Sequence, residues 1–516
     1  MIISELYALY KQHPVVTTDS RACPPGAIFF ALKGETFDGN AYAGKALQAG
    51  CAYAVVENVS APAGNNDLTL SANNDASVPI NNDGVSVPSD KRMIVVENVL
   101  ETLQQLARFH REALGTKIIG ITGTNGKTTT KELIAKVLSQ KYNTLHTEGN
   151  LNNHIGVPLT LLKLTDRHEL AVVEMGASHP GEIRELAEIA RPDYGLITNV
   201  GYAHMEGFGS FEGVVRTKGE LYDFIRETNG MIFIDRNNKR LMEMAKGIKK
   251  TTYGNIPDES AQSTETDESA RKMKTDGTLQ QSGQEDMCRR QSPSVTGEVI
   301  QNDPFLSFRW HLQNAATQDI ETSRVDTHLV GKYNLYNALA AITAGLYFRI
   351  PPEQINEALS SYLPTNNRSQ LKKTDHNILI IDAYNANPSS MKAALENFAL
   401  LEKRYIRSAP DRLPDTVSSS AKDSVSSQKA VILGDMLELG EESPKMHEEI
   451  ISLVNKCGFN KVLLCGERFY AAGQTYTRFK TVDELNKHLK TTPLKGYEIL
   501  IKGSRGIHLE NIIDNL

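Results

Sequence analysis

The stretch KIIGITGTNGKTTTKELIAKVL, residues 117–138, decides the fold of this 516-residue chain. Residues 117–122 are mostly apolar and β-branched, which is typical of a buried strand. Gly123 and Gly126 interrupt this pattern, and apolar residues then recur at the spacing of a helix: Leu133, Ile134, Val137 and Leu138. A strand, a Gly-rich turn and a helix in immediate succession predict a phosphate-binding loop in an α/β fold.

The chemistry of this loop follows from its backbone and from two side chains. Backbone N–H groups of a Gly-rich turn and of a helix N-terminus together form an anion site. Lys127 can reach the β- and γ-phosphates of a nucleotide, and the Thr128 hydroxyl can bind Mg²⁺. The general phosphate-loop pattern needs Gly where this chain has Ile121, which argues against the common motor ATPases and GTPases. A Gly-rich turn without a ligand is the alternative, and the agreement of strand, glycines, Lys-Thr and helix disfavours it.

Further apolar, β-branched runs lie outward from this unit, with amphipathic stretches between most of them. They occupy residues 169–175, 194–200, 230–234, 377–383, 430–435, 461–466 and 497–503. Alternating strands and helices predict α/β layers with parallel sheets. The runs form two groups, about 115–235 and 375–510, and the segment 334–348 predicts a helix before Pro351.

We therefore predict an α/β chain of three domains. A small N-terminal α/β substrate domain covers residues 1–98. A central parallel-sheet domain with the phosphate loop covers 99–350, and a C-terminal Rossmann-like domain covers 351–516. A length of 516 residues divided by about 150 residues per domain agrees with this number once insertions are removed.

Three segments interrupt the globular pattern and are predicted to be mobile surface insertions. They are residues 60–90, where Asn-Asn-Asp occurs three times, residues 256–304, and residues 408–428. All three are rich in small and polar residues and poor in large apolar ones, so they cannot bury enough surface to offset chain entropy. Segments that bind a partner are the alternative interpretation.

Composition limits the class of protein. A formal net charge of −6 argues against a nucleic-acid backbone as the main partner, because such proteins usually carry a basic patch. The five cysteines are scattered without a CxxC pair, which argues against a disulfide framework or a zinc ribbon. The N-terminus does not resemble a signal peptide, and no apolar run reaches the length of a membrane span. We expect a soluble cytoplasmic protein.

Several side chains near predicted strand ends could carry chemistry. Glu174 ends a strand, where a carboxylate beside a phosphate loop could bind a metal, although most such residues are merely solvated. His204 could bind a second cation, although a lone His is usually structural. Spacing alone assigns Lys218 nothing beyond a helix lysine. Asp382 could cap a helix, and the segment 385–388 could be only a turn.

Five motifs in collinear order resemble the Mur ligase family of ATP-dependent, amide-forming enzymes of peptidoglycan synthesis. They are GTNGKTTT (123–130), VEMG (173–176), TNVGYAHMEGFGS (198–210), TKGEL (217–221) and GKYNLYNALAA (331–341). Six others narrow the resemblance to members that add D-alanyl-D-alanine to a UDP-N-acetylmuramoyl-tripeptide. These are DSR (19–21), FFALKGETFDGN (29–40), GNLNNHIGVPLT (149–160), IDAYNANPSSM (381–391), LGDMLELG (433–440) and KGSRGIHLE (502–510).

The resemblance implies roles for individual residues. ATP would be bound by Gly123, Thr124, Asn125, Gly126, Lys127, Thr128, Thr129, Asn334, Asn337, Arg368 and Asp382. Mg²⁺, in two sites, would be held by Thr128, Glu174, His204 and a CO₂-carbamylated Lys218. The UDP-sugar, peptide and dipeptide would contact Asp19, Ser20, Arg21, Asn150, Asn152, Asn153, Asn385, Asn387 and Arg505. The catalytic residues would be Lys127, Lys218 and His204.

The resemblance also implies that the substrate carboxylate attacks the γ-phosphate of ATP and that the dipeptide amine then attacks the acyl phosphate. Domain closure would exclude water from that intermediate. We expect a monomer whose partners are small molecules. Three alternatives stay open: a related ligase for another amino acid or a folylpolyglutamate synthetase-like enzyme, a phosphotransferase that acts on a hydroxyl, and a nucleotide-binding scaffold without turnover.

Overall fold

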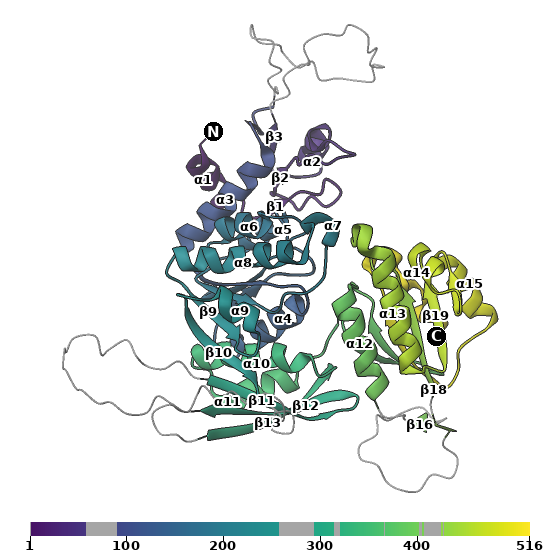
Figure 1. The fold of residues 1–516 in the computed structure, drawn as a ribbon. Helices are drawn as coiled ribbons and strands as arrows, with labels where there is room; N and C mark the ends of the chain where they lie inside the picture. The colour runs from purple at the N-terminus through teal and green to yellow at the C-terminus, as the bar shows by residue number, and fades with distance from the viewer. Residues whose placement is uncertain are drawn as a thin grey trace, which may run out of the picture. The chain divides into compact units, whose positions relative to one another are not determined.

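The computed structural model describes residues 2–57, 90–256, 294–313, 320–365, 367–401, 405–406, 425–426 and 428–516. The chain divides into two compact units. Figure 1 shows the helices and strands in chain order by colour. The first consists of residues up to Thr122 together with Tyr142–Ala177 and Gly181–Tyr194. The second consists of Gly123–Lys141, Ser178–Pro180 and Gly195–Leu516. The predicted domain boundaries at residues 98/99 and 350/351 stay predictions.

The N-terminal part of the first unit contains a four-stranded parallel sheet. Its order is β1 (Val16–Thr17), β2 (Ile28–Phe30), β3 (Tyr53–Glu57) and β4 (Met93–Val96). Three helical segments accompany it: α1 (Ile3–Gln12), the 3-10 helix η1 (Gly39–Tyr42) and α2 (Ala43–Gln48). Phe29, Leu47 and Val56 pack in its core, because alternate strand residues point to one face. Apart from Asp90, the predicted insertion 60–90 lies outside the described residues.

The rest of the first unit contains the strand of the phosphate loop. Strand β7 (Leu170–Glu174) pairs in parallel with both β5 (Lys117–Thr122) and β6 (Thr144–His146). The helices are α3 (Val99–Leu114), α5 (Gly156–Leu161) and α6 (Glu182–Ala190). Helix α3 begins where the Asn98 side chain accepts a hydrogen bond from Glu101 N, and it ends at Gly115 with a φ of +68°.

In the second unit, the helix of the phosphate loop is α4 (Lys127–Leu138), which packs against α10 (Asn334–Tyr347). Strand β8 (Tyr194–Ile197) leads into this unit. Strand β10 (Lys249–Asn255) pairs in parallel with β9 (Met231–Asp235) and with β11 (Ser294–Asn302). Antiparallel pairs then join β11 to β12 (Phe305–Gln313) and β12 to β13 (Ile320–Val330). The remaining helices of this part are α7 (Met205–Phe208), α8 (Phe211–Glu227), α9 (Lys239–Met244) and α11 (Pro352–Ser360).

The prediction of an insertion over residues 256–304 is wrong at its C-terminal end. Residues 294–302 form β11 instead, and Val295 is completely buried there. Polar residues dominate the composition of the stretch 257–293, and this masks the β-branched residues of SVTGEVIQN that follow it. Strand β12 was not among the predicted strands, although Leu306, Phe308 and Trp310 alternate along it and are fully buried. Residues 257–293 lie outside the described part of the chain.

The C-terminal part of the second unit is a six-stranded sheet. Its order is β14 (Gln370–Lys373), β15 (Ile378–Asp382), β21 (Tyr497–Lys502), β18 (Gln428–Gly434), β19 (Lys461–Cys465) and β20 (Thr477–Phe479). Only β14 is antiparallel to its neighbour. The helices are α12 (Pro388–Leu400), α13 (Ser443–Cys457), α14 (Glu467–Ala472) and α15 (Val482–Thr491). A separate pair joins β16 (Tyr405–Ile406) to β17 (Val425–Ser426), so the described end of the predicted insertion 408–428 lies in β17 and β18.

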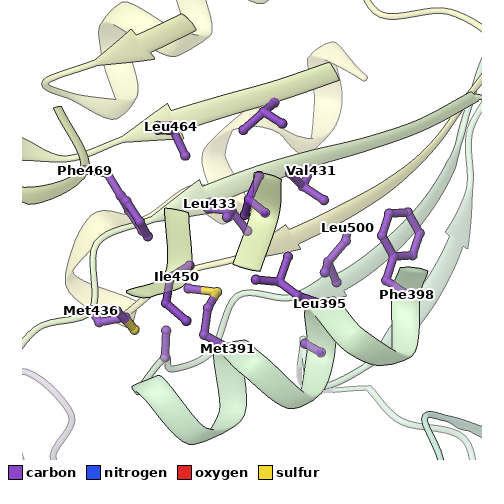
Figure 2. Packing of buried hydrophobic residues seen from close by; sticks show 14 of the residues in the cluster. Met391, Leu395, Phe398, Val431, Leu433, Met436, Ile450, Leu464, Phe469 and Leu500 are labelled. Carbon is purple, nitrogen blue, oxygen red and sulfur yellow. The ribbon is translucent and has the colours of Figure 1, made fainter. Parts of the chain in front are cut away.

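Helices cover both faces of this sheet, as expected for a Rossmann-like domain. Val431 and Leu433 of β18 pack against α12 and α13, as Figure 2 shows for Leu395 and Ile450. The intervening Ala430 and Ile432 belong to a second cluster, with Leu485 and Leu489 of α15. Full burial of a Leu or Ile side chain contributes about 1.5–3 kcal/mol, so both faces stabilise the sheet. The predicted α/β class is confirmed.

Within the described residues, no helix combines the length and the apolar character needed to span a membrane.

Two buried polar residues hold the segment that follows β18. The Asp435 carboxylate accepts hydrogen bonds from the N–H groups of Arg468 and Phe469, both at 2.8 Å, at the start of α14. The His447 Nε2 accepts from Met436 N at 3.1 Å, and its Nδ1 faces Ser443 O at 2.7 Å. These partners require the neutral ring with its proton on Nδ1.

Stability should fall as the solution is acidified, because burial lowers the pKa of His447 below its usual 6.5. The unfolded chain then binds a proton at a higher pH than the folded chain, so stability is complete above about pH 6.5 and decreases below it. The slope contributed by one such ring is at most about 1.4 kcal/mol per pH unit. Thermal melts between pH 7.5 and 5.5 should show a weaker pH dependence in His447→Gln than in the exposed control His376→Gln.

Candidate active site

The loop between β5 and α4 needs both of its glycines. Gly123 has a φ of +140°, and a Cβ there would lie 2.0 Å from the Thr198 Oγ1. Gly126 has a φ of +78°, and a Cβ there would lie 2.7 Å from the Asn337 Oδ1. Residues with a Cβ rarely adopt such φ values, and neither approach leaves room for a methyl group. The predicted Gly-rich turn between the strand and the helix is therefore confirmed.

Gly126→Ala should weaken nucleotide binding as well as stability. The matched control is Gly115→Ala, since Gly115 also has a left-handed φ, +68°, but no atom within 4 Å of a Cβ. The control should cost only the left-handed strain of about 1–2 kcal/mol, whereas Gly126→Ala adds an overpacking cost of about 1–3 kcal/mol. Thermal melts and calorimetric ATP titrations would check this. Equal effects of the two substitutions on ATP affinity would contradict it.

The segment after β8 forms hydrogen bonds with the phosphate loop. The Thr124 N–H donates to Asn199 O at 3.0 Å, and the Asn125 N–H donates to the Asn199 Oδ1 at 3.0 Å. In return, the Thr198 hydroxyl donates to Asn125 O at 2.6 Å, and the Gly201 N–H donates to the Thr124 hydroxyl at 2.9 Å. These four bonds lie entirely within the protein and hold the loop in place.

Lys127 lies over this loop at the first position of α4. Its Nζ donates to Gly123 O at 2.7 Å and to Thr124 O at 3.2 Å. Thr128, at the next position, is buried. A positive group near loop N–H groups and a helix N-terminus suits an anionic phosphate chain.

Asn334 and Asn337, predicted to contact ATP, lie in α10 behind the loop. The Thr130 hydroxyl donates to the Asn337 Oδ1 at 3.0 Å, and the Asn337 Nδ2 donates to the Asn334 Oδ1 at 2.8 Å. The Asn334 Nδ2 in turn donates to Val330 O at 2.9 Å. This chain of hydrogen bonds joins α10 to α4, so both side chains have a structural role. A contact with ATP stays a prediction for them.

In the first unit, Glu174 ends β7 and is only 1% exposed. Its Oε1 accepts a hydrogen bond from the Asn152 Nδ2 at 2.8 Å, and its backbone N–H donates to the Thr147 hydroxyl at 3.0 Å. Asn152 is itself fixed, because its carbonyl accepts from Gly176 N at 2.7 Å. Two predicted site residues, Glu174 and Asn152, are thus brought into contact.

The second carboxylate oxygen of Glu174, Oε2, is buried without a hydrogen-bond partner among the described residues. Leaving a buried carboxylate oxygen unsatisfied is costly, so such an atom calls for an explanation such as an ion. An oxygen ligand of this kind fits Mg²⁺, which prefers carboxylates.

The other predicted substrate residues of the first unit lie at its surface. Arg21 donates through Nε and Nη2 to the two oxygens of the Asp19 carboxylate, both at 2.9 Å, which lowers the pKa of Asp19 to about 2. Ser20 lies between them, and Asn150 is exposed. The Asn153 Oδ1 accepts from the N–H of Gly156 at 2.9 Å, at the start of α5. Among the described residues, no hydrogen bond or ion pair joins the segment Asp19–Arg21 to Asn150 or Asn153.

In the second unit, His204 and Lys218 share one aromatic neighbour. The Phe208 ring of α7 meets the His204 ring edge-on, with centroids 6.1 Å apart. The Lys218 Nζ lies 5.3 Å from the centroid of the same ring. Lys218 is only 2% exposed, an unusual place for a charged ammonium group.

Asp382, a predicted ATP contact, ends β15 and is engaged with the protein. Its Oδ2 accepts from the Lys502 Nζ at 2.6 Å, and its Oδ1 accepts from Ser369 N at 3.3 Å. Lys502 is 1% exposed and also donates to Asn385 O at 3.1 Å. The buried Lys502 therefore fixes both ends of the 382–385 segment.

The ring of Tyr384 lies next to two arginines that were predicted to be site residues. The Arg368 guanidinium lies 3.7 Å above the centroid of its ring, and that of Arg505 lies 5.5 Å from it. Stacking on an aromatic face orders guanidinium groups while leaving their N–H groups available. Arg368 and Arg505 thus converge on the segment that contains Asn385.

Asn387 connects this segment to the phosphate loop. Its Nδ2 donates to the Asn125 Oδ1 at 2.8 Å, while its own Oδ1 caps α12 by accepting from Ser390 N at 2.9 Å. Ser389 lies beside the loop support as well, since a Cβ on Gly201 would be 3.0 Å from its Oγ. The predicted dipeptide segment and the predicted ATP loop are therefore in contact.

The predicted metal ligands are divided between the units. Glu174 belongs to the first, and Thr128, His204 and Lys218 belong to the second. In the described part of the chain, no three His, Cys, Asp or Glu side chains are grouped in a way that could hold a metal ion. The predicted set of metal ligands also includes Thr128 and a carbamylated Lys218, which are not His, Cys, Asp or Glu. This set of ligands therefore stays a prediction.

Four residues that the sequence analysis did not select contribute to the site. They are Asn199, Tyr384, Glu438 and Lys502. Each lies within one of the motifs quoted above, and this position in a motif is the sequence signal that could have identified it as a site residue. Their roles depend on partners far away in the sequence, which no local pattern reveals.

Two family models match successive parts of the chain. A family model described as Mur ligase middle domain matches residues 121–345. A second, described as Mur ligase family, catalytic domain, matches residues 14–111.

Several similar proteins carry one name, UDP-N-acetylmuramoyl-tripeptide–D-alanyl-D-alanine ligase. The protein of that name from Bacillus subtilis is 33% identical, over 97% of this chain and 92% of its own length. Its counterpart from Escherichia coli is 30% identical, over 96% and 92%. A crystal structure of MurF from Acinetobacter baumannii superimposes with a TM-score of 0.70 at 26% identity, covering 97% of this chain and 92% of that one.

Proposed function

The chain belongs to the Mur ligase family, and from that premise we propose that it joins D-alanyl-D-alanine to a UDP-N-acetylmuramoyl-tripeptide. ATP supplies the energy, and the products are the UDP-linked pentapeptide, ADP and phosphate. The relatives named for this reaction match almost the full length of the chain.

One contact carries the proposal, the hydrogen bond between Asn387 and Asn125. An amide ligase must activate a carboxylate with ATP and then present an amine to it. These two tasks require the phosphate loop and the amine site to meet. The bond joins the loop to the DAYNANP segment, where the dipeptide is expected.

In the first step, a carboxylate oxygen of the tripeptide attacks the γ-phosphorus of ATP. The bond from the γ-phosphorus to the β,γ-bridging oxygen breaks, and ADP leaves. Both groups are anionic, so catalysis depends on positioning and on charge neutralisation. Lys127 and the loop N–H groups bind the phosphates, and Arg368 adds a second positive charge from the C-terminal sheet.

The Oε2 of Glu174 is buried without a hydrogen-bond partner among the described residues, and this supports the binding of a divalent cation by Glu174. One Mg²⁺ would be held by Thr128 of the phosphate loop, and a second by Glu174, His204 and a carbamylated Lys218. The two ions would neutralise charge on the phosphates and the substrate carboxylate. The carbamate forms when the uncharged Lys218 amine adds to CO₂ and loses a proton. The modification replaces a buried cation with an anionic oxygen ligand.

In the second step, the amine of D-alanyl-D-alanine attacks the acyl carbon. The bond between that carbon and the phosphate oxygen breaks, phosphate leaves, and the nitrogen loses a proton. Asn385 and Arg505 are the proposed contacts of the dipeptide, and Lys502 holds their segment in place. Water must be excluded here, because the acyl phosphate would otherwise hydrolyse.

We place the reaction in the cytoplasm, where ATP and nucleotide-linked precursors are found. A single chain is the proposed working unit.

Phosphate release tests the proposal and separates it from its alternatives. A mixture of the purified protein, ATP, Mg²⁺ and the UDP-linked tripeptide should release phosphate from ATP only when D-alanyl-D-alanine is present. Dependence on a different amino acid or on glutamate would indicate another ligase of this kind. Transfer of phosphate to a hydroxyl acceptor, or no turnover at all, would contradict ligation.

A further inference from the structure

A contact beyond the proposed ligands links His204 to the C-terminal sheet. The carboxylate of Glu438, in the connection between β18 and α13, forms an ion pair with the His204 Nδ1. The pair lacks regular hydrogen-bond geometry, and Nδ1 is otherwise buried without a partner among the described residues. None of the proposed catalytic steps uses Glu438.

The backbone at both ends of this contact is strained. His204 has a φ of +51° and Glu438 a φ of +62°, although neither is glycine. Non-glycine residues adopt this region at a cost in strain, and they persist there only where the surroundings hold them. Two such residues face each other here, so the surrounding structure must hold both ends of the contact.

Neighbouring residues hold the two segments together. The Glu206 N–H donates to Glu438 O at 3.4 Å. Gly440 lies so near that a Cβ there would be 3.4 Å from the Glu206 Cα. Met205, next to His204, packs against the core cluster of the C-terminal sheet. The ion pair therefore belongs to a wider contact between the start of α7 and the LGDMLELG segment.

The base of that segment is also fixed. The Leu437 N–H donates to the Ser504 hydroxyl at 3.0 Å, and the Met436 N–H donates to the buried His447. These hydrogen bonds fix the backbone immediately before Glu438. Its side chain is 59% exposed, so its removal should leave the fold intact.

We propose that Glu438 is a positioning residue for the metal site, holding His204 by Nδ1 so that Nε2 is left to bind the cation. The inference rests on the proposed role of His204 as a magnesium ligand. A histidine that binds a metal commonly donates its other ring N–H to a carboxylate, which fixes the tautomer and makes the ligand more basic. Since Glu438 lies in the connection that follows β18, the metal ligand depends on the C-terminal part of the chain.

The test compares four full-length variants: Glu438→Ala, Glu438→Gln, His204→Ala and the control Glu441→Ala. Glu441 is an exposed acidic residue three positions further on, in the 3-10 helix Gly440–Glu442, so its removal changes the charge equally. The first readout is Mn²⁺ affinity by electron paramagnetic resonance, with a non-hydrolysable ATP analogue present. Glu438→Ala should weaken binding about 10- to 100-fold, the usual cost of losing such a partner. Glu438→Gln should have a smaller effect, and Glu441→Ala none.

The second readout needs no metal. Nitrogen-15 spectra of histidine-labelled protein should show His204 protonated on Nδ1, and Glu438→Ala should shift the ring toward a mixture of tautomers. The His204→Ala spectrum assigns the signal. An unchanged tautomer together with Mn²⁺ affinity within twofold of wild type in Glu438→Ala would overturn the inference.

His204→Ala distinguishes the two possible failures. If it weakens Mn²⁺ binding while Glu438→Ala does not, the positioning role is wrong and the proposed ligand role survives. If His204→Ala leaves Mn²⁺ affinity unchanged, His204 is not a ligand, and both proposals fail at that residue.

Discussion

Lys127→Ala should lower kcat by about 10²- to 10³-fold or more, the loss expected when one preorganised charge-stabilising group is removed. Lys127 is held over the phosphate loop by the carbonyl oxygens of Gly123 and Thr124. Its charge is needed most when negative charge develops during transfer of the γ-phosphate. The substitution should therefore reduce kcat more than it weakens ATP binding.

The matched control is Lys136→Ala, on an exposed position of the same helix α4. It removes the same charge and should leave kcat within about twofold, since surface substitutions rarely matter. Steady-state phosphate release and calorimetric ATP binding together separate kcat from affinity. Near-normal turnover in Lys127→Ala would contradict the proposed use of the loop.

Lys218→Ala should abolish most activity and should be partly rescued by added short carboxylic acids. The loss should exceed the roughly 100-fold cost of removing an outer-shell partner, because a direct metal ligand disappears. Lys218 is buried beside Phe208, so the truncated side chain leaves a space that a small carboxylate can enter. That carboxylate would replace the oxygen ligand of the carbamate.

Two further variants make this test specific. Lys218→Met fills the same space without a nitrogen, so it should be inactive and should not be rescued. Arg216→Ala, at an exposed position of the same helix, should remain active. Wild-type protein supplied with carbon-13-labelled CO₂ should show a carbamate signal that Lys218→Ala lacks. Full activity of Lys218→Ala without added acid would refute carbamylation.

Local patterns were sufficient for most of the fold. The run KIIGIT became β5 over the same residues, 117–122, and the helix predicted over 334–348 became α10 (Asn334–Tyr347). Both are short-range signals, in which apolar spacing decides which face is buried. Composition was less reliable, since it placed β11 in an insertion although SVTGEVIQN contains the β-branched residues of a strand.

Local sequence patterns predict only part of the candidate site. The motif around Lys127 predicted the loop, because phosphate binding imposes its own local sequence. The supports at Asn199 and Asn337 were not predictable, since hydrogen bonds between distant segments leave no spacing pattern. The ion pair of Glu438 with His204 likewise joins residues more than 200 positions apart.

Transfer of oxygen-18 tests the central claim, ligation through an acyl phosphate, most directly. The terminal carboxylate of the UDP-linked tripeptide is labelled in both oxygens, and the reaction runs with ATP, Mg²⁺ and D-alanyl-D-alanine. The account predicts a pentapeptide that keeps one labelled oxygen in its new amide and inorganic phosphate that carries the other. Unlabelled phosphate, or labelled phosphate formed without a pentapeptide, would contradict it.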